Sequence, residues 1–267
     1  MPTIQTRAGR VAYGELGTGP TVLLLHAALH DRRDFDPVLE PLARRYRTIA
    51  VDWPGHGNSD PVAATVEPSA PLFADVLEDV VDGLGVSRAV LIGNSVGGFA
   101  AARLAITRPE SVAGLVLVNT GGFVPLNPMS RTFCRVLGTP AVFRRVAPLF
   151  IRGYMKANTD SDREIIARAT EAAKTREGLR LGTGLWRSFA TPAHDLRSRA
   201  AQLSAPTLIM WGKKDIAIPL SAGRATRDSI RGSRFEMLNT GHVVFSSDPD
   251  GFLAVAEPFL QSLSLPE

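Results

Sequence analysis

The stretch LIGNSVGGFAA, residues 91–101, places a serine between glycines where an apolar run gives way to an alanine-rich one. Residues 88–93 are typical of a short buried strand, and residues 96–107 are typical of a helix. The motif GNSVG therefore falls on a strand–turn–helix corner. A serine that only caps a helix would explain Ser95 but not the glycines on both sides. A serine nucleophile projecting from a tight, strained turn explains both.

Strand-like and helix-like segments alternate on either side of this corner. Strands are predicted at 21–26, 46–53, 88–93, 112–119, 205–212 and 233–239, and helices at 36–45, 70–84, 96–107, 219–230 and 248–263. Most of the strand segments are continuous apolar runs rather than alternating ones, which indicates strands covered on both faces. The pattern predicts an α/β fold with a mostly parallel, twisted sheet and helices on each side.

Residues 123–200 break this alternation. They contain helix-like stretches at 129–137, 140–151 and 161–176, with glycine or proline breaks at Gly138–Pro140, Gly178 and Gly182–Gly184. None of these residues forms a convincing strand pattern. The chain is therefore predicted to consist of a core, residues 1–122 and 201–267, and an all-helical insertion, residues 123–200.

Length and composition are those of one large globular domain with a smaller insertion. The chain has 267 residues, of which 45% are hydrophobic and 21% charged. No apolar run approaches the ~20 residues that span a bilayer, so no integral membrane association is expected. The first ten residues lack the apolar segment of a secretory signal, which favours a cytoplasmic protein. Cys134 has no second cysteine to pair with and is interpreted as a packing residue, not a nucleophile.

The net charge of +4 comes from an arginine-rich composition, with 26 Arg and 4 Lys. No basic run is interleaved with aromatic residues, so no nucleic-acid partner is expected. Residues 123–200 hold 14 Arg or Lys against 6 Asp or Glu, a net charge of +8. This segment is either a solvated basic surface or a cover that attracts acidic substrates.

A serine nucleophile needs a base, and the chain offers five histidines. His242 follows the last predicted strand and should lie at the same sheet edge as Ser95, so it is the predicted base. His56 lies in a Gly/Pro turn and is interpreted as structural. His26 ends a strand and is expected to orient the loop that follows it, whereas His194 is predicted to lie on the surface.

The histidine in turn needs a carboxylate that fixes its tautomer. Asp215, in MWGKKDIAIP, closely follows a strand and precedes a helix, which places it at the same edge. Asp52 also ends a strand, but it precedes the serine in the chain and opens a turn, so a turn or capping role is predicted. The catalytic triad is therefore predicted as Ser95, Asp215 and His242.

Five pieces of the sequence, in this order, resemble the α/β-hydrolase fold family: LLLHAA, VDWPGHGNSD, GNSVGG, WGKKD and TGH. The resemblance extends over nearly the whole chain. It implies an oxyanion hole made by the backbone N–H groups of Val96 and Ala28, and it implies that residues 123–200 form a helical lid. One position departs from the family, because Ala27 stands where glycine is usual. If that position needs a backbone conformation open only to glycine, the N–H of Ala28 would be misplaced.

The predicted reaction is acyl transfer from a small-molecule substrate to water through an acyl-enzyme, with no metal and no organic cofactor. Serine at position 95 disfavours the epoxide hydrolases and haloalkane dehalogenases that share the fold but use aspartate. The sequence GNS is similar to that of hydrolases that cleave carbon–carbon bonds of ring-fission products, although these carry tryptophan where Val243 stands. A binding or signalling protein on the same scaffold is a further alternative.

Aromatic residues are frequent in the predicted lid. They either line an apolar acyl pocket or pack the lid itself. They are Phe123, Phe133, Phe143, Phe150, Tyr154, Trp186 and Phe189.

Overall fold

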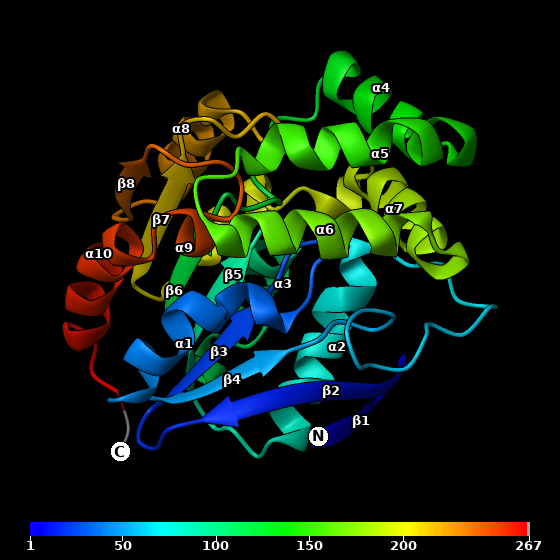
Figure 1. Ribbon diagram of the computed structural model, residues 1–267. Coiled ribbons are helices and arrows are strands. Elements are labelled where there is room, and N and C mark those ends of the chain that lie inside the picture. The colour runs from blue at the N-terminus through cyan, green and yellow to red at the C-terminus, as the bar shows by residue number, and fades with distance from the viewer. Residues whose placement is uncertain (266–267) are drawn as a thin grey trace.

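The computed structural model describes residues 1–265 and has an eight-stranded sheet at its centre (Figure 1). The strands are β1 (Thr3–Thr6), β2 (Gly9–Leu16), β3 (Thr21–Leu25), β4 (Arg47–Val51), β5 (Ala89–Asn94), β6 (Val112–Val118), β7 (Thr207–Gly212) and β8 (Arg234–Leu238). Their order across the sheet is β1-β2-β4-β3-β5-β6-β7-β8. Strands β3 to β8 run parallel to one another, and β2 runs antiparallel to both of its neighbours, β1 and β4. The predicted fold class is confirmed.

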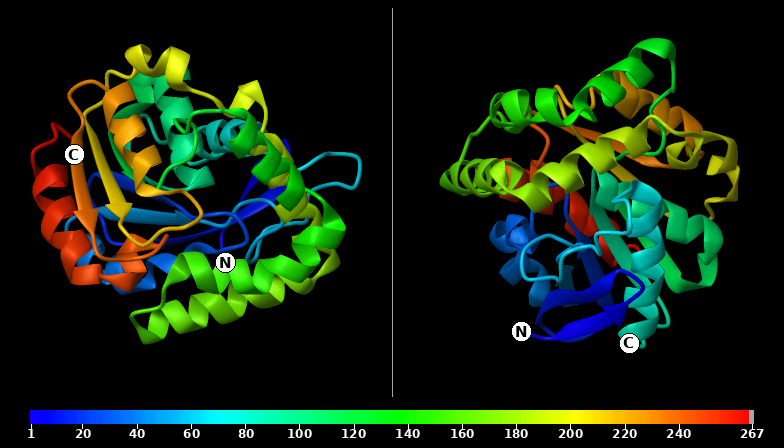
Figure 2. Two further views of the ribbon diagram at one scale, coloured as in Figure 1. Left: turned by 90° about the horizontal axis from the view of Figure 1, so that it is seen from above. Right: turned by 90° about the vertical axis from the view of Figure 1, so that its right-hand side faces the viewer.

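Helices cover both faces of the sheet (Figure 2). One layer contains α2 (Ala70–Gly83), α3 (Val96–Thr107) and α8 (Leu220–Ser229), and the other contains α1 (Asp36–Ala43), α9 (Val244–Ser247) and α10 (Pro249–Gln261). Alternate residues of one strand enter opposite cores: Leu91 packs in the first layer, while Val90 and Ile92 pack in the second. This two-sided burial is the reason that the strand sequences are apolar without alternation.

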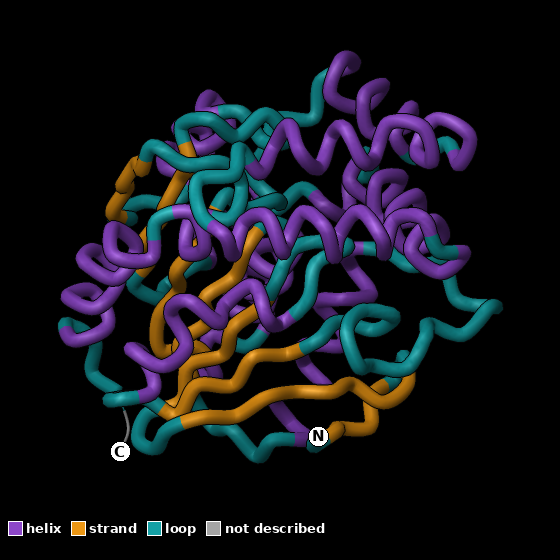
Figure 3. Tube along the Cα trace, in the orientation of Figure 1, coloured by secondary structure: helices purple, strands orange, loops and turns teal. Residues whose placement is uncertain are grey.

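Between β6 and β7 the chain forms only helices and loops, over residues that the structure describes throughout (Figure 3). The helices are α4 (Pro128–Leu137), α5 (Pro140–Met155), α6 (Asp160–Lys174) and α7 (Arg176–Phe189), followed by the short 3₁₀ helices η3 (Pro192–His194) and η4 (Arg197–Gln202). We call residues 123–200 the insertion. It lies at the top of Figure 1, at the end of the molecule opposite the β1–β2 hairpin. Within residues 1–265, no helix has the length and apolar content needed to cross a membrane.

The helix α7 was not predicted, because its glycines suggested breaks. Gly178, Gly182 and Gly184 all lie inside it. A Cβ atom on Gly182 would lie 2.3 Å from the Phe143 ring, and one on Gly184 would lie 2.5 Å from the carbonyl oxygen of Pro68. These glycines therefore allow close packing of α7 rather than ending it.

Candidate active site

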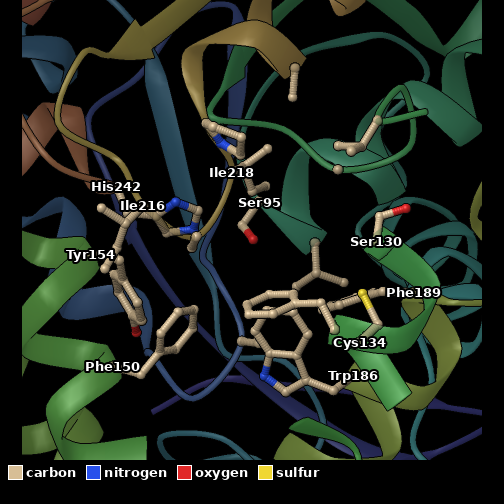
Figure 4. Close-up of a pocket in the computed structure, with 18 of the residues that line it drawn as sticks. Ser95, Ser130, Cys134, Phe150, Tyr154, Trp186, Phe189, Ile216, Ile218 and His242 are labelled. Atoms are coloured by element: carbon tan, nitrogen blue, oxygen red, sulfur yellow. The ribbon is translucent and has the colours of Figure 1, made fainter. Parts of the chain in front are cut away.

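Ser95 links β5 to α3 in a backbone conformation that residues with a side chain rarely adopt. Its φ is 57° and its ψ is −114°. Its own N–H donates to the carbonyl oxygen of Val118 (3.1 Å), and its carbonyl oxygen accepts from Gly121 N–H (3.0 Å), which hold the turn against β6 and the loop after it. The side chain lines a cavity beneath the helices of the insertion (Figure 4). The strained turn predicted from GNSVG is present.

The glycines around Ser95 are needed because backbones approach one another there. A Cβ atom on Gly97 would lie 2.3 Å from the carbonyl oxygen of Leu25, and one on Gly93 would lie 2.5 Å from the carbonyl oxygen of Gly97. The start of α3 can therefore pack directly against the end of β3. This brings the loop after β3 close to the serine.

His242 and Asp215 form a buried hydrogen-bonded pair. The Nδ1–H of His242 donates to Oδ2 of Asp215 over 2.6 Å. The other carboxylate oxygen accepts from the N–H groups of Ala217 (2.7 Å) and Ile218 (3.2 Å), so the carboxylate cannot rotate freely. With its proton on Nδ1, the imidazole keeps Nε2 as an unprotonated acceptor. His242 lines the same cavity as Ser95, and Figure 4 shows the two side chains together.

The main chain of His242 is held at both its N–H and its carbonyl group. The N–H donates to the carbonyl oxygen of Tyr154 (2.9 Å), in the last turn of α5. The carbonyl oxygen accepts from the side-chain amides of Asn94 (3.0 Å) and Asn119 (2.8 Å). Sequence reasoning singled out Tyr154 only as an aromatic residue of the predicted lid, and it did not find Asn119, for which the one available signal was a polar residue directly after the apolar run of β6.

The backbone N–H groups of Val96 and Ala28 border the cavity beside Ser95. Val96 is the first residue of α3, where an N–H has no partner within its helix. Neither N–H donates a hydrogen bond to any residue that the structure describes. The expected difficulty at Ala27 is absent, because the φ of Ala27 is not in the left-handed region. Leu29 occupies that region instead, with φ of 68°.

Two buried histidines hold the loop that carries Ala28. Nε2 of His56 accepts from the N–H of Leu29, and Nε2 of His26 accepts from the N–H of Trp53, each over 3.0 Å. Their Nδ1–H groups donate to main-chain carbonyl oxygens. Burial lowers the pKa of His26 to about 4 and that of His56 to about 3, so both rings are neutral and keep their acceptor nitrogen. The structural roles predicted for both residues are confirmed.

Asp52, the other carboxylate at a strand end, has structural partners. Its two carboxylate oxygens accept from the N–H groups of Arg32 (2.9 Å) and Asn58 (3.0 Å). These bonds tie the loops after β3 and β4 together, which agrees with the predicted turn role. Among residues 1–265, no group of three or more His, Cys, Asp or Glu is placed to hold a metal ion.

The cavity has a volume of about 530 Å³ and lies between the carboxyl ends of the core strands and the insertion. Six of the seven aromatic residues singled out in the sequence line it, and Phe123 is instead buried in the core. Edge-to-face contacts join Phe150 to Trp186 and Trp186 to Phe189, at ring distances of 5.7 and 5.4 Å. These residues both line the cavity and pack the insertion, so the two interpretations coincide.

The prediction of a surface position for His194 is wrong. The residue is 7% exposed and lies between the rings of Phe99 (4.6 Å) and Phe189 (4.8 Å), at the cavity wall. Burial lowers its pKa to about 4, and its Nε2 has no hydrogen-bond partner in the described part of the chain. The polar sequence around it, TPAHDLRSR, indicated a surface loop because Phe99, one of the two aromatic residues that cover it, is distant in sequence.

The comparison with known families agrees with this geometry. A model of the Alpha/beta hydrolase family matches residues 22–255. The chain belongs to the alpha/beta hydrolase family. The match includes all of the insertion, residues 123–200, and most of the rest of the chain.

Relatives and solved structures similar to this hydrolase have several names. A 2-hydroxy-6-oxononadienedioate/2-hydroxy-6-oxononatrienedioate hydrolase of Pseudomonas putida is 30% identical, over 93% of this chain and 91% of its own. A thermophilic esterase from Thermogutta terrifontis is 25% identical, with a TM-score of 0.80 and 97% of each chain covered. An enol-lactonase from Burkholderia xenovorans LB400 has a TM-score of 0.84 at 20% identity, over 98% of this chain and 100% of its own, which shows the shared fold.

Proposed function

We propose that this hydrolase cleaves a carboxylic ester or related acyl bond of a small, partly apolar substrate, with Ser95, His242 and Asp215 as its catalytic triad. The observation that carries the proposal is the strained Ser95, whose side chain shares one cavity with the hydrogen-bonded His242–Asp215 pair. Ser95 is held at positive φ, and Gly93 and Gly97 near it leave no room for side chains. A packing role for Ser95 would not explain why this strained conformation is kept.

In the proposed mechanism, Nε2 of His242 removes the proton of Ser95 as Oγ attacks the substrate carbonyl carbon. The negative charge that develops on the carbonyl oxygen is stabilised by the N–H groups of Val96 and Ala28. The imidazolium, paired with Asp215, then gives its proton to the leaving group. Water, deprotonated by the same imidazole, attacks the acyl-enzyme and releases the acid and the free serine.

We further propose that residues 123–200 act as a lid over a core made of residues 1–122 and 201–267. The aromatic residues of α5 and α7 form one wall of the cavity, and the Ser95 loop forms the opposite one. Apolar walls would exclude water around the acyl group and strengthen the electrostatic interactions at the reacting carbonyl.

Carbon–carbon bond hydrolysis is the second candidate function. The relative from Pseudomonas putida, named for hydrolysis of a dienedioate, favours this reaction. Asn94 before the serine agrees with it, whereas Val243 in place of the usual tryptophan does not. Both reactions would use the same triad, so they differ in the substrate that the cavity admits.

The proposal is tested by intact mass measurement after exposure to a fluorophosphonate probe. Wild type should gain the mass of a single adduct, and Ser95→Ala should gain none. Ser221→Ala, which removes another serine that lines the cavity, should label like wild type. An unlabelled wild-type protein would contradict an activated serine and would favour a non-hydrolytic binding protein on this scaffold.

A further inference from the structure

We propose that the cavity selects substrates whose acyl group is uncharged and rejects those that carry a carboxylate within it. This inference rests on the proposed acyl-transfer function and specifies its substrate class. It concerns the part of the substrate that the insertion encloses, next to the scissile bond.

The cavity wall contains no residue that could neutralise an anion. Thirty residues line it, all within the described part of the chain, and none is Arg, Lys, Asp or Glu. Two of them are histidines. His242 is engaged with Asp215, and burial keeps the other, His194, neutral. A carboxylate that enters this space would lose its hydration without gaining a positive partner, which strongly disfavours binding.

The remaining polar groups of the wall are largely engaged within the protein. The hydroxyl of Tyr154 is hydrogen-bonded to Nε2 of His30 (2.9 Å) and points away from Ser95 (Figure 4). The hydroxyl of Ser130 donates to main-chain carbonyl oxygens, and its N–H donates to the side-chain oxygen of Asn127 (2.8 Å). Burial raises the pKa of Cys134 to about 11, so its thiol is neutral and contributes apolar surface.

The positive charge of the insertion lies outside the cavity. Five arginines of α4 and α5 are exposed, and none of them lines the cavity or belongs to an ion pair within residues 1–265. They are Arg131, Arg135, Arg144, Arg145 and Arg152. The basic composition of this segment is therefore a solvated surface at these positions, and it provides no carboxylate-binding group beside Ser95.

This arrangement separates the two candidate substrate classes. A dienedioate carries a carboxylate at each end of its carbon chain. A carboxylate that the protein encloses needs a cationic partner. An ester or lactone with an alkyl or aryl acyl group needs none. Among the names of similar proteins, the cavity chemistry therefore fits esterase or lactonase substrates better than dioates.

The test uses three p-nitrophenyl esters that share a six-carbon acyl chain: the hexanoate, the adipate with a free terminal carboxylate, and the methyl ester of that adipate. The methyl ester keeps both oxygens at the end of the chain, is larger than the carboxylate by one methyl group, and carries no charge. We expect kcat/KM for the hexanoate and the methyl ester to agree within about tenfold, and kcat/KM for the free carboxylate to be at least ~10²-fold lower. A free carboxylate hydrolysed within tenfold of its methyl ester would overturn the inference.

Binding to Ser95→Ala keeps this test separate from the test of the triad. Binding of the same esters is followed through the change in intrinsic tryptophan fluorescence, since Trp186 is the one of the three tryptophans that lines the cavity. If wild type hydrolyses none of the esters faster than Ser95→Ala, but the variant still binds the methyl ester at least tenfold more tightly than the free carboxylate, only the proposed function fails. If the variant binds both equally, the selectivity proposed here fails.

Discussion

The main-chain N–H of His242 donates to the carbonyl oxygen of Tyr154, over 2.9 Å, so a helix of the insertion holds the proposed catalytic base. The same tyrosine is fixed at its other end, where its hydroxyl meets His30. His30 is paired with Asp34, which also accepts from Arg168 of α6 (3.0 Å). Helices α5 and α6 are thereby connected to the loop after β3, and both sides of the cavity are fixed through one buried polar network.

Two substitutions separate the main-chain contact from the hydroxyl contact. Tyr154→Phe keeps the carbonyl acceptor and leaves His30 with an unpaired buried nitrogen, so we expect a loss of about 1–3 kcal/mol in unfolding free energy and a kcat within about threefold of wild type. Gly241→Ala would place a Cβ atom 2.0 Å from the carbonyl oxygen of Met155 and displace the His242 loop. Its kcat/KM should fall at least ~10²-fold. Urea unfolding measures the stability of each variant, and ester hydrolysis measures its kcat and kcat/KM. Equal kcat/KM values for the two variants would contradict a special role of the main-chain contact.

Asp215→Asn should lower kcat by ~10²–10⁴-fold while leaving the fold intact. An amide nitrogen beside Nδ1 favours the tautomer with its proton on Nε2, and this tautomer cannot accept the serine proton. Steady-state kinetics on the hexanoate ester measures the loss, and thermal unfolding checks the fold. The assignment of Asp215 as the acid is wrong if the variant retains wild-type kcat.

Ala27→Gly tests the position at which this chain departs from the family. Because Ala27 is outside the left-handed region, alanine should not displace the N–H of Ala28. Glycine should leave kcat/KM within about twofold and lower the unfolding free energy by about 0.4–1 kcal/mol, through the greater freedom of the unfolded chain. A tenfold gain in kcat would show instead that alanine impairs the oxyanion hole.

Acid should destabilise the protein through its buried histidines. The pKa values of His26, His56 and His194 are about 4, 3 and 4 in the folded state, against about 6.5 when exposed. The unfolded state therefore binds more protons, so stability rises with pH. The contribution of these residues is complete above pH 6.5 and is lost as the pH falls toward 4, at up to about 1.4 kcal/mol per pH unit for each histidine. Unfolding in urea between pH 7 and 4.5 measures the slope.

His194→Phe is the matched variant for this measurement. Phenylalanine retains a ring between Phe99 and Phe189. It removes Nε2, which has no described partner, and also the hydrogen bond of the other ring nitrogen to the main chain of Phe189, so the unfolding free energy at pH 7 should fall by about 0.5–1.5 kcal/mol. The part of the slope of unfolding free energy against pH that comes from histidines should fall by about a third, since one of the three histidines with a lowered pKa is removed. An unchanged slope would mean that His194 is not a proton-linked group in this range.

The sequence predicted the core because its signals are local. Gly93 and Gly97 mark a turn whose geometry allows nothing larger, and the parallel strands β5, β6 and β7 each appear as an apolar run. Ser95, Asp215 and His242 were predicted to lie together because each follows a strand, and the carboxyl ends of parallel strands lie at one edge of the sheet. The hairpin of β1 and β2 was not predicted, because β2 mixes buried and exposed residues around two glycines.

The parts that could not be predicted depend on contacts distant in sequence. Gly182 is compatible with a helix only because Phe143 fills the space beside it. His194 is buried against the ring of Phe99, which is distant in sequence, as well as against the nearby Phe189. The placement of charge also depends on the fold. The net charge of +8 of the insertion can be counted from the sequence, but only the structure shows that none of its arginines lines the cavity.

The close approach of Gly241 to the end of α5 limits how specificity can be redesigned in this enzyme. A chimera that exchanged residues 123–200 for a cap from another protein would remove the carbonyl groups of Tyr154 and Met155 along with the substrate-facing wall. A transplanted cap therefore has to reproduce this helix end at the histidine loop. Without it, the chimera would gain a new cavity wall and lose the alignment of His242, the proposed base. Evolution of this enzyme toward new substrates is expected to preserve the last turn of α5 while the remaining wall residues vary.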